Sequence, residues 1–163
     1  MSKLQPPGTT QLDKHVGTDF LPLYTATVRV SGGDAIRDNG SEIASCDDRN
    51  LDVQLHLAQP WSGSGGGANP EQLFAAGYAA CFHGALSLLA ERAKVAIHDA
   101  QVVASVTFGR DPVDGLFALT ADIRIHLPGV DRAIAGELVR NTERICPYTK
   151  MTKTGIECVV LLA

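Results

Sequence analysis

The sequence predicts an α+β fold, because its strand-like and helix-like segments are segregated along the chain and do not alternate regularly. Three features carry this prediction: a long apolar helix over residues 69–90, two alternating strand-like segments at residues 98–109 and 116–127, and a second helix that begins at Asp131. The chain has 163 residues, enough for one hydrophobic core but not for two.

The long helix is the centre of the predicted fold. Asn69 is a favourable N-cap, and Pro70 suits the first helical position. Glu71 places a carboxylate in the first turn, where the helix dipole stabilises it. Nearly every side chain over residues 73–90 is apolar or small, so we expect this helix to be buried on all sides.

The apolar run of this helix does not suit a membrane span. Gly77, His83 and Gly84 interrupt it, and a charged residue stands at each end. We therefore interpret it as the core helix of a domain at residues 23–163, preceded by an N-terminal extension at residues 1–22.

The other elements are predicted from the alternation of apolar and polar residues, from turn residues and from helix caps. We expect a strand that leaves through a Gly-Gly turn, a short β-piece near Ile43, a half-buried strand, and a hairpin closed by the turn at residues 111–115. Pro147 should end the second helix, and a short helical turn and a last strand should follow. The corresponding strands are at residues 23–30, 51–57, 98–109, 116–127 and 156–162, and the helical turn is at residues 147–153.

Composition excludes some classes of function. The formal net charge is −4, so the sequence lacks the excess of basic residues that is typical of nucleic-acid-binding proteins. The first twenty residues lack the apolar core of a signal peptide, which makes the cytoplasm the expected location. Cysteines there are reduced at rest, and a disulfide in such a protein is more often transient and catalytic than structural. No Cys-x-x-Cys pair is present, which argues against a zinc site.

Two of the four cysteines lie where they could meet. Cys81 is in the middle of the apolar helix, and Cys146 lies on the same helical stripe as Leu138 and Thr142, and as Ile134 before them. Two thiols that meet in a cytosolic protein are typically a redox pair. The alternative, two buried cysteines on separate faces, stays open on spacing alone. Of the other two cysteines, we expect Cys46 to be exposed and without a role in the chemistry, and Cys158 to lie in the core.

Two motifs carry a resemblance to a known family. The segment NPEQLFAAGYAACF at residues 69–82 resembles the signature of the organic hydroperoxide resistance (Ohr) proteins, within the wider OsmC-like family. The segment CPYTKMT at residues 146–152 resembles the second-cysteine motif of the family. YTAT at residues 24–27 and LDVQL at residues 51–55 are similar to its first two strands.

The resemblance implies a thiol-dependent peroxidase that reduces alkyl or fatty-acid-type hydroperoxides to alcohols. It assigns Cys81 as the peroxidatic cysteine, Cys146 as the resolving cysteine and Glu71 as the active-site glutamate. It implies no bound cofactor, and recycling by a lipoyl-type dithiol such as dihydrolipoamide or a lipoylated protein. The implied fold has antiparallel β-sheets around a long buried central helix, in an intertwined homodimer.

The activating arginine is where this sequence departs from the pattern of the family. That arginine usually follows directly on the Gly-Gly after the first strand, and this sequence has Asp34 there, in a longer loop. Arg37 is the nearest candidate, with Arg29 and Arg49 behind it. An arginine held by Glu71 would stabilise the thiolate of Cys81.

Apolar and aromatic side chains flank the two cysteines in the sequence. We expect them to line a pocket that binds the organic part of a peroxide. We expect the protein to bind neither nucleic acid nor a membrane. The six candidates are Leu73, Phe74, Phe82, Ile145, Tyr148 and Met151. Two other interpretations remain: a non-catalytic carrier of an apolar ligand, in which the cysteines only pack, and a redox sensor.

Overall fold

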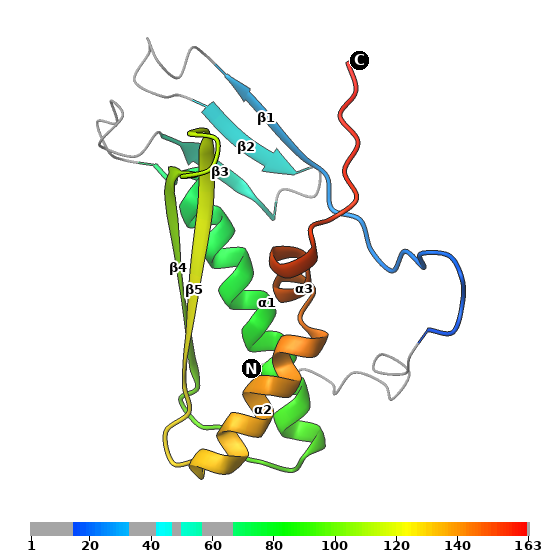
Figure 1. Ribbon diagram of the computed structural model, residues 1–163, viewed down its shortest axis with the longest axis vertical. Helices are drawn as coiled ribbons and strands as arrows, with labels where there is room; N and C mark the ends of the chain where they lie inside the picture. The colour runs from blue at the N-terminus through cyan, green and yellow to red at the C-terminus, as the bar shows by residue number, and fades with distance from the viewer. Residues whose placement is uncertain (1–14, 33–41, 47–49, 57–66, 163) are drawn as a thin grey trace. The chain divides into compact units, whose positions relative to one another are not determined.

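The computed structural model describes residues 15–32, 42–46, 50–56 and 67–162 (Figure 1). The chain forms two compact units, Met1–Leu73 and Phe74–Ala163. The boundary falls inside a helix and not in a linker, and the expected single domain stays a prediction. Of the expected extension, residues 15–22 are exposed and contain no helix or strand, and the rest lies outside the described residues.

The first unit contains a small antiparallel sheet of three strands in the order β1-β2-β3. They are β1 (Val28–Gly32), β2 (Glu42–Cys46) and β3 (Asp52–Leu55). The strand expected to start at residue 23 begins at Val28, because Val28 pairs with Cys46, the last residue of β2. The β-piece predicted near Ile43 is confirmed as β2.

The second unit combines a long hairpin with helices (Figure 1). It contains most of α1 (Pro70–Arg92), β4 (Gln101–Arg110), β5 (Phe117–His126), α2 (Arg132–Ile145) and α3 (Pro147–Thr154). The predicted hairpin is confirmed: β4 and β5 pair antiparallel over ten residues each. The main-chain N–H of Asp111 donates to the carbonyl of Leu116 across the turn, at 2.8 Å.

Side chains fix the starts of the two longer helices as the sequence predicts. The N–H of Gln72 donates to Asn69 Oδ1 at 2.8 Å, and the N–H of Asn69 donates to Gln72 Oε1 at 2.9 Å, a reciprocal capping box. Asp131 Oδ1 accepts from the N–H groups of Ala133 and Ile134 at the start of α2. These bonds satisfy N–H groups that the helices leave without a partner.

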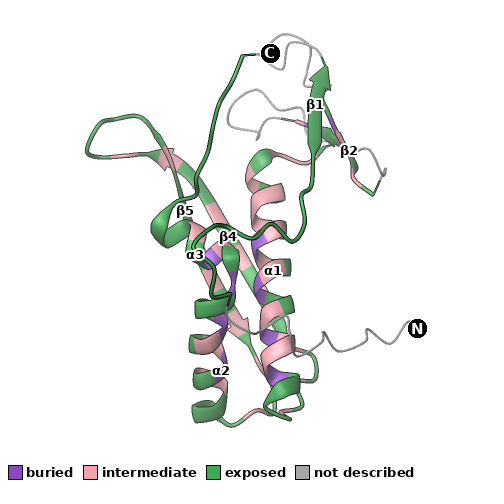
Figure 2. Cartoon of the chain, turned by 90° about the vertical axis from the view of Figure 1, so that its right-hand side faces the viewer, coloured by how far each residue is buried: buried purple, intermediate pink, exposed green. Residues whose placement is uncertain are grey.

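Within this chain, α1 is buried on one stripe and not on all sides (Figure 2). The buried residues recur every fourth position, at Tyr78, Phe82, Leu86 and Ala90. The expectation of complete burial is therefore wrong for the single chain, because the described α1 residues outside this stripe are half-buried or exposed. By length and composition alone α1 is also apolar enough to cross a membrane, a property that core helices share.

The buried stripe of α1 packs against both the hairpin and α2. Tyr78 and Phe82 form a cluster with Cys146, joined by half-buried residues of β4 and β5. Leu86 and Ala90 form a second cluster with Leu138 of α2. The hairpin thus lies along α1 and α2, and its inner face supplies Val102, Ala104, Ile123 and Ile125.

Several apolar side chains of the second unit remain exposed. Near the turn of the hairpin, Leu116, Phe117 and Leu119 are exposed. The strand predicted at residues 156–162 is wrong: the segment has no helix or strand and is exposed throughout, because no described strand pairs with it. Cys158, expected in the core, is consequently exposed.

Candidate active site

Cys81 lies in the middle of α1, one residue before a buried position. The next residue, Phe82, is buried in the cluster between the helix and the hairpin, whereas Cys81 is half-buried. The helix is unbroken through Gly77, so Cys81 is held by a regular backbone on both sides. Its sulfur therefore faces the cluster without being sealed inside it.

Cys146 stands at the break between two helices. It is both the C-cap of α2 and the N-cap of α3, and its backbone is extended. Its N–H donates to the carbonyl of Thr142 at 2.9 Å, and Pro147 then starts the new helix. Leu138, Thr142 and Cys146 are buried as the spacing predicted, whereas Ile134, at the start of the same stripe, is 45% exposed.

The fold brings the two thiols together. The Cys146 thiol donates to Cys81 Sγ with a sulfur–sulfur distance of 3.6 Å. Both are thiols, Cys146 fully buried and Cys81 partly accessible. A disulfide bond is about 2.05 Å long, so a movement of roughly 1.5 Å would join them. The sequence left open whether the two cysteines meet or lie buried on separate faces, and the structure confirms that they meet.

Burial raises the pKa of the Cys81 thiol above its ordinary value. The main cause is desolvation, and the neighbouring Cys146 adds to it. The main-chain N–H of Tyr148, at the start of α3, acts in the opposite direction and lowers the pKa. A reactive thiolate at Cys81 therefore needs further positive charge, which these neighbours do not supply.

The predicted pocket residues divide into three groups. Phe74, Phe82 and Tyr148 pack in the cluster around the two sulfur atoms. Met151 is half-buried on α3, and Ile145 is 39% exposed at the end of α2. Leu73 is half-buried and belongs to the first unit.

The charged candidates lie apart from this cluster in the sequence. Glu71 is in the first turn of α1, ten residues before Cys81. Arg29 is an exposed residue of β1. Arg37 and Arg49 lie outside the described residues.

Sequence reasoning missed a group of hydroxyls beside the thiols. Tyr78 Oη donates to Thr149 Oγ1 at 3.2 Å and lies 3.3 Å from Thr152 Oγ1. Tyr78 and Thr149 are 4% and 3% exposed. The available signal was spacing, since Tyr78 precedes Cys81 by three residues and Thr149 follows Cys146 by three.

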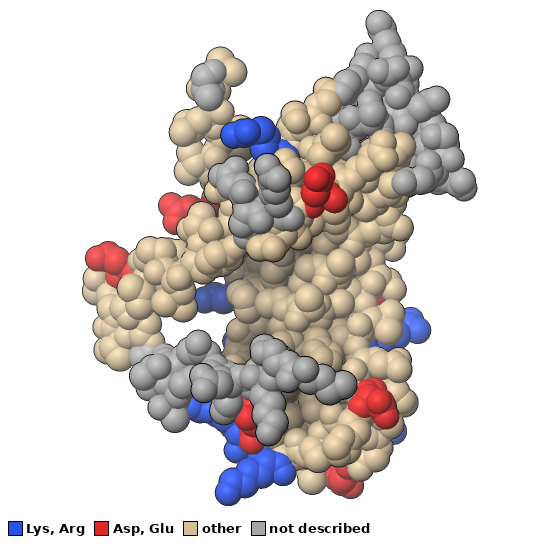
Figure 3. Space-filling model, turned by 180° about the vertical axis from the view of Figure 1, so that it is seen from behind, with Lys and Arg blue, Asp and Glu red and all other residues tan. Residues whose placement is uncertain are grey.

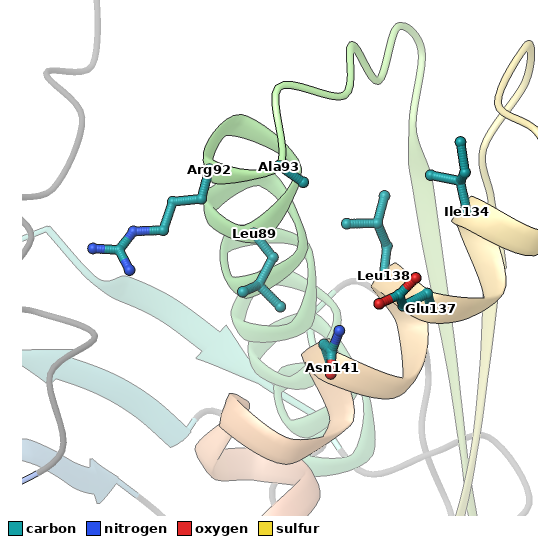
Figure 4. A pocket seen from close by; sticks show the side chains of 7 residues that line it. All are labelled: Leu89, Arg92, Ala93, Ile134, Glu137, Leu138 and Asn141. Carbon is teal, nitrogen blue, oxygen red and sulfur yellow. The ribbon is translucent and has the colours of Figure 1, made fainter.

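Two cavities of the second unit are relevant to ligand binding. One of about 430 Å³ adjoins this cluster and is lined by Phe74, Tyr78, Leu119, Thr120, Ala121, Thr152 and Lys153. Another of about 320 Å³ lies toward the end of α1, beside α2 (Figure 4), and its lining contains no cysteine: Leu89, Arg92, Ala93, Ile134, Glu137, Leu138 and Asn141. Neither lining includes a cysteine, but the first cavity shares Phe74 and Tyr78 with the cluster that contains the two thiols and is therefore the better placed for a substrate of Cys81.

No metal centre stands out in the described part of the chain, where no three His, Cys, Asp or Glu side chains gather closely enough to hold an ion. On the face drawn in Figure 3, basic and acidic side chains are scattered among other residues.

Together, the fold and the site define an α+β protein built around a close pair of thiols.

Comparison with known proteins agrees with this class. Residues 63–160 match the family model described as OsmC-like protein. The organic hydroperoxide resistance protein of Xanthomonas axonopodis pv. citri is 38% identical over 86% of this chain and 95% of its own length. An uncharacterized protein of Acinetobacter baylyi is 42% identical over 83% of this chain and 90% of that protein.

A solved structure shows the same fold. The crystal structure of the organic hydroperoxide resistance protein OhrB of Bacillus subtilis superposes with a TM-score of 0.70 at 35% identity, covering 82% of this chain and 93% of that one. This chain belongs to the OsmC-like family, with organic hydroperoxide resistance proteins among its relatives.

Proposed function

We propose that this protein is a thiol-dependent peroxidase that reduces organic hydroperoxides to alcohols. The observation that carries the proposal is the distance of 3.6 Å between the sulfur atoms of Cys81 and Cys146. The names of the relatives, organic hydroperoxide resistance proteins, support it. A pair of thiols at this distance can give up two electrons and become a disulfide, which is the change that reduces a peroxide.

The first step uses the accessible member of the pair. The thiolate of Cys81 attacks the distal oxygen of the peroxide, the O–O bond breaks, and the alkoxide leaves and takes up a proton to become the alcohol. Cys81 becomes a sulfenic acid. An arginine held by Glu71 would favour the thiolate that burial disfavours, and Arg37 is our candidate.

The second step uses the buried member. Cys146 Sγ attacks the sulfenic sulfur, a sulfur–sulfur bond forms, and the hydroxyl leaves as water. A dithiol of the lipoyl type, dihydrolipoamide or a lipoylated protein, then reopens the disulfide by two exchange reactions and is itself oxidised. The cycle uses no cofactor bound to the protein.

The surroundings of Cys81 suit an apolar peroxide. Phe74, Phe82 and Tyr148 pack around the two sulfur atoms, and the cavity of about 430 Å³ shares Phe74 with them. Burying an alkyl or acyl chain here would contribute about 25 cal/mol per Å² of apolar surface. Hydrogen peroxide has no such surface and would gain nothing.

We propose that the active unit is a homodimer in which each site uses both chains. Glu71 and Cys81 are ten residues apart on an unbroken helix, which places them roughly 15 Å apart along its axis. A glutamate–arginine pair is too short to act over that distance. An antiparallel α1 from a second copy would bring its Glu71 near Cys81, and the exposed apolar side chains of the hairpin offer an area for contact. The protein would act in the cytoplasm, without nucleic acid or membrane.

Thiol counting tests the proposal. The reduced protein receives one equivalent of an alkyl hydroperoxide, and its accessible and buried thiols are titrated after unfolding. We expect the rapid loss of two thiols per chain and the release of one equivalent of alcohol. Cys81→Ser protein is the control and should lose none. Unchanged thiols in the native protein would contradict the proposal.

A carrier of an apolar ligand is the second candidate, and the cavity of about 430 Å³ is the observation that favours it. A carrier would bind the alcohol or the peroxide reversibly and keep all its thiols. The same titration therefore separates the two functions.

A further inference from the structure

We propose that Tyr78 and Thr149 form a hydroxyl clamp that positions α3 so that Cys146 can close on Cys81. The inference deepens the proposed function and rests on it, because it assigns residues to the second step of that cycle. Tyr78 Oη donates to Thr149 Oγ1 at 3.2 Å and joins α1 directly to α3. The two hydroxyls bond to each other and not to a sulfur atom, so both are positioning residues.

The clamp lies one helical turn from the thiols on each helix. On α1, Tyr78 precedes Cys81 by three residues, and on α3, Thr149 follows Cys146 by three. Three residues correspond to a rise of about 4.5 Å along a helix. Two contacts therefore join the same two helices side by side: one between hydroxyls and one between sulfur atoms.

The start of α3 benefits from such a contact because it has no side-chain cap of its own. Cys146 is the N-cap of α3 and makes no side-chain capping bond. It is also the C-cap of α2, so a single extended residue separates the two helices. The direction of α3 relative to α2 is then decided by what α3 packs against.

Burial makes the hydrogen bond of the clamp difficult to replace by a bond to water. Tyr78 is 4% and Thr149 is 3% exposed, so water cannot readily replace the partner of either hydroxyl. Thr152 reinforces the arrangement: its Oγ1 donates to the carbonyl of Thr149 at 3.0 Å and lies 3.3 Å from Tyr78 Oη. The ring of Tyr148 packs 5.8 Å from that of Tyr78, measured between centroids.

The expected role follows from the distance that disulfide closure must cover. The sulfur atoms start at 3.6 Å, and a misplacement of 1 Å can cost a reaction about 100-fold in rate. Loss of the clamp should therefore slow closure of the disulfide. The attack of Cys81 on the peroxide forms no bond to Cys146, so closure is timed separately from that step.

The test compares Tyr78→Phe and Thr149→Val with the native protein. Disulfide closure is timed with diamide, which takes two electrons and two protons from a pair of thiols whether or not the protein is a peroxidase. We expect closure to slow about tenfold or more in both variants. The double variant should be no slower than the slower single variant, because both changes remove the same bond.

Two further variants separate positioning from general damage. Thr149→Ser keeps the hydroxyl and should close at the native rate. Thr154→Val makes the same kind of substitution in the same helix, at an exposed hydroxyl that bonds only to α3 and the following residue, and should also close at the native rate. If Thr149→Val fails to fold, Tyr78→Phe and Thr149→Ser still decide the question.

The outcomes distinguish this inference from the proposed function. Native closure rates in both Tyr78→Phe and Thr149→Val would overturn the clamp, even if the protein is a peroxidase. Slow closure in Thr149→Ser would also overturn it, because packing and not the hydroxyl would then be responsible. If native protein consumes no peroxide but the variants close slowly with diamide, the clamp stands and the peroxidase proposal fails.

Discussion

The sulfur atoms of Cys81 and Cys146 lie 3.6 Å apart, although 65 residues separate the two cysteines in the sequence. One comes from the middle of a long helix and the other from the break between two shorter helices. Their exposure differs, since Cys146 is fully buried and Cys81 is partly accessible. The pair is therefore asymmetric, and the two thiols should have different roles.

The first prediction concerns those roles. Cys81→Ser should abolish peroxide consumption, because the accessible thiolate is lost. Cys146→Ser should still oxidise once at Cys81 and then stop at the sulfenic acid. Trapping with a sulfenic-acid reagent and mass spectrometry of the intact protein measure this. Normal turnover of Cys146→Ser with a dithiol would show that Cys146 is not the resolving cysteine.

The second prediction concerns the peroxide. Bulky organic hydroperoxides should exceed hydrogen peroxide in kcat/KM, because the aromatic cluster around the thiols gains free energy from apolar surface. Phe74→Ala should reduce this preference mainly through KM for the bulky peroxide, while hydrogen peroxide is reduced as before. Equal efficiency of the native protein with both peroxides would count against an apolar pocket.

The third prediction concerns pH and the activating arginine. Because burial raises the pKa of the Cys81 thiol, less thiolate is present at a given pH, and the reaction rate should rise as pH increases through that pKa. A nearby guanidinium lowers the pKa and moves the profile to lower pH. In Arg37→Ala, the midpoint for alkylation of Cys81 by iodoacetamide should move to higher pH.

Arg29→Ala and Arg49→Ala serve as matched variants for this measurement. Their alkylation profiles should coincide with that of the native protein. A shift in either of them, with Arg37→Ala unchanged, would transfer the activating role to that arginine.

The fourth prediction concerns the shared site. A heterodimer is purified from cells that express Cys81→Ser chains together with Glu71→Ala chains. If each site takes Glu71 from the partner, both changes fall in one site, and the other site keeps about half of the native activity. If each chain serves its own site, every site carries one change and the heterodimer should be nearly inactive. Each homodimer, measured alone, sets the baseline.

The fifth prediction uses two glycines of α1. A Cβ at Gly77 would lie 2.9 Å from Tyr148 Oη, so Gly77→Ala must displace that ring, whereas a Cβ at Gly84 meets nothing within 4 Å. Alanine favours a helix over glycine by about 1 kcal/mol. Gly84→Ala should therefore raise the free energy of unfolding by up to that amount, and Gly77→Ala should raise it less and slow disulfide closure. Denaturant unfolding measures the first effect, and a loss of stability in Gly84→Ala would indicate that another chain packs there.

Local chemistry made several elements predictable from the sequence. The Asn69 and Asp131 caps mark where two helices begin, and the turn after Asp111 marks where the hairpin closes, because these signals involve residues only a few positions apart. Pro147 ends α2 for the same kind of reason. The step of four residues between Leu138, Thr142 and Cys146 correctly placed the second thiol on a buried face.

Other features depend on what each segment packs against, and the sequence contains no local signal for that. The segment at residues 156–162 is as rich in β-formers as a strand, yet it forms none, because a strand needs a partner edge. The apolar composition of α1 did not reveal which of its residues would be fully buried within the chain.

Local signals placed the starts of the longer helices and the turn of the hairpin, and they put two cysteines on apolar helical faces. That these faces meet, so that Cys146 approaches Cys81 and Tyr78 bonds to Thr149, became visible in the packed fold. Caps, turns and periodicity act over a few residues, whereas these contacts join residues about seventy positions apart, and the packing of α1 against α3 brings them within reach.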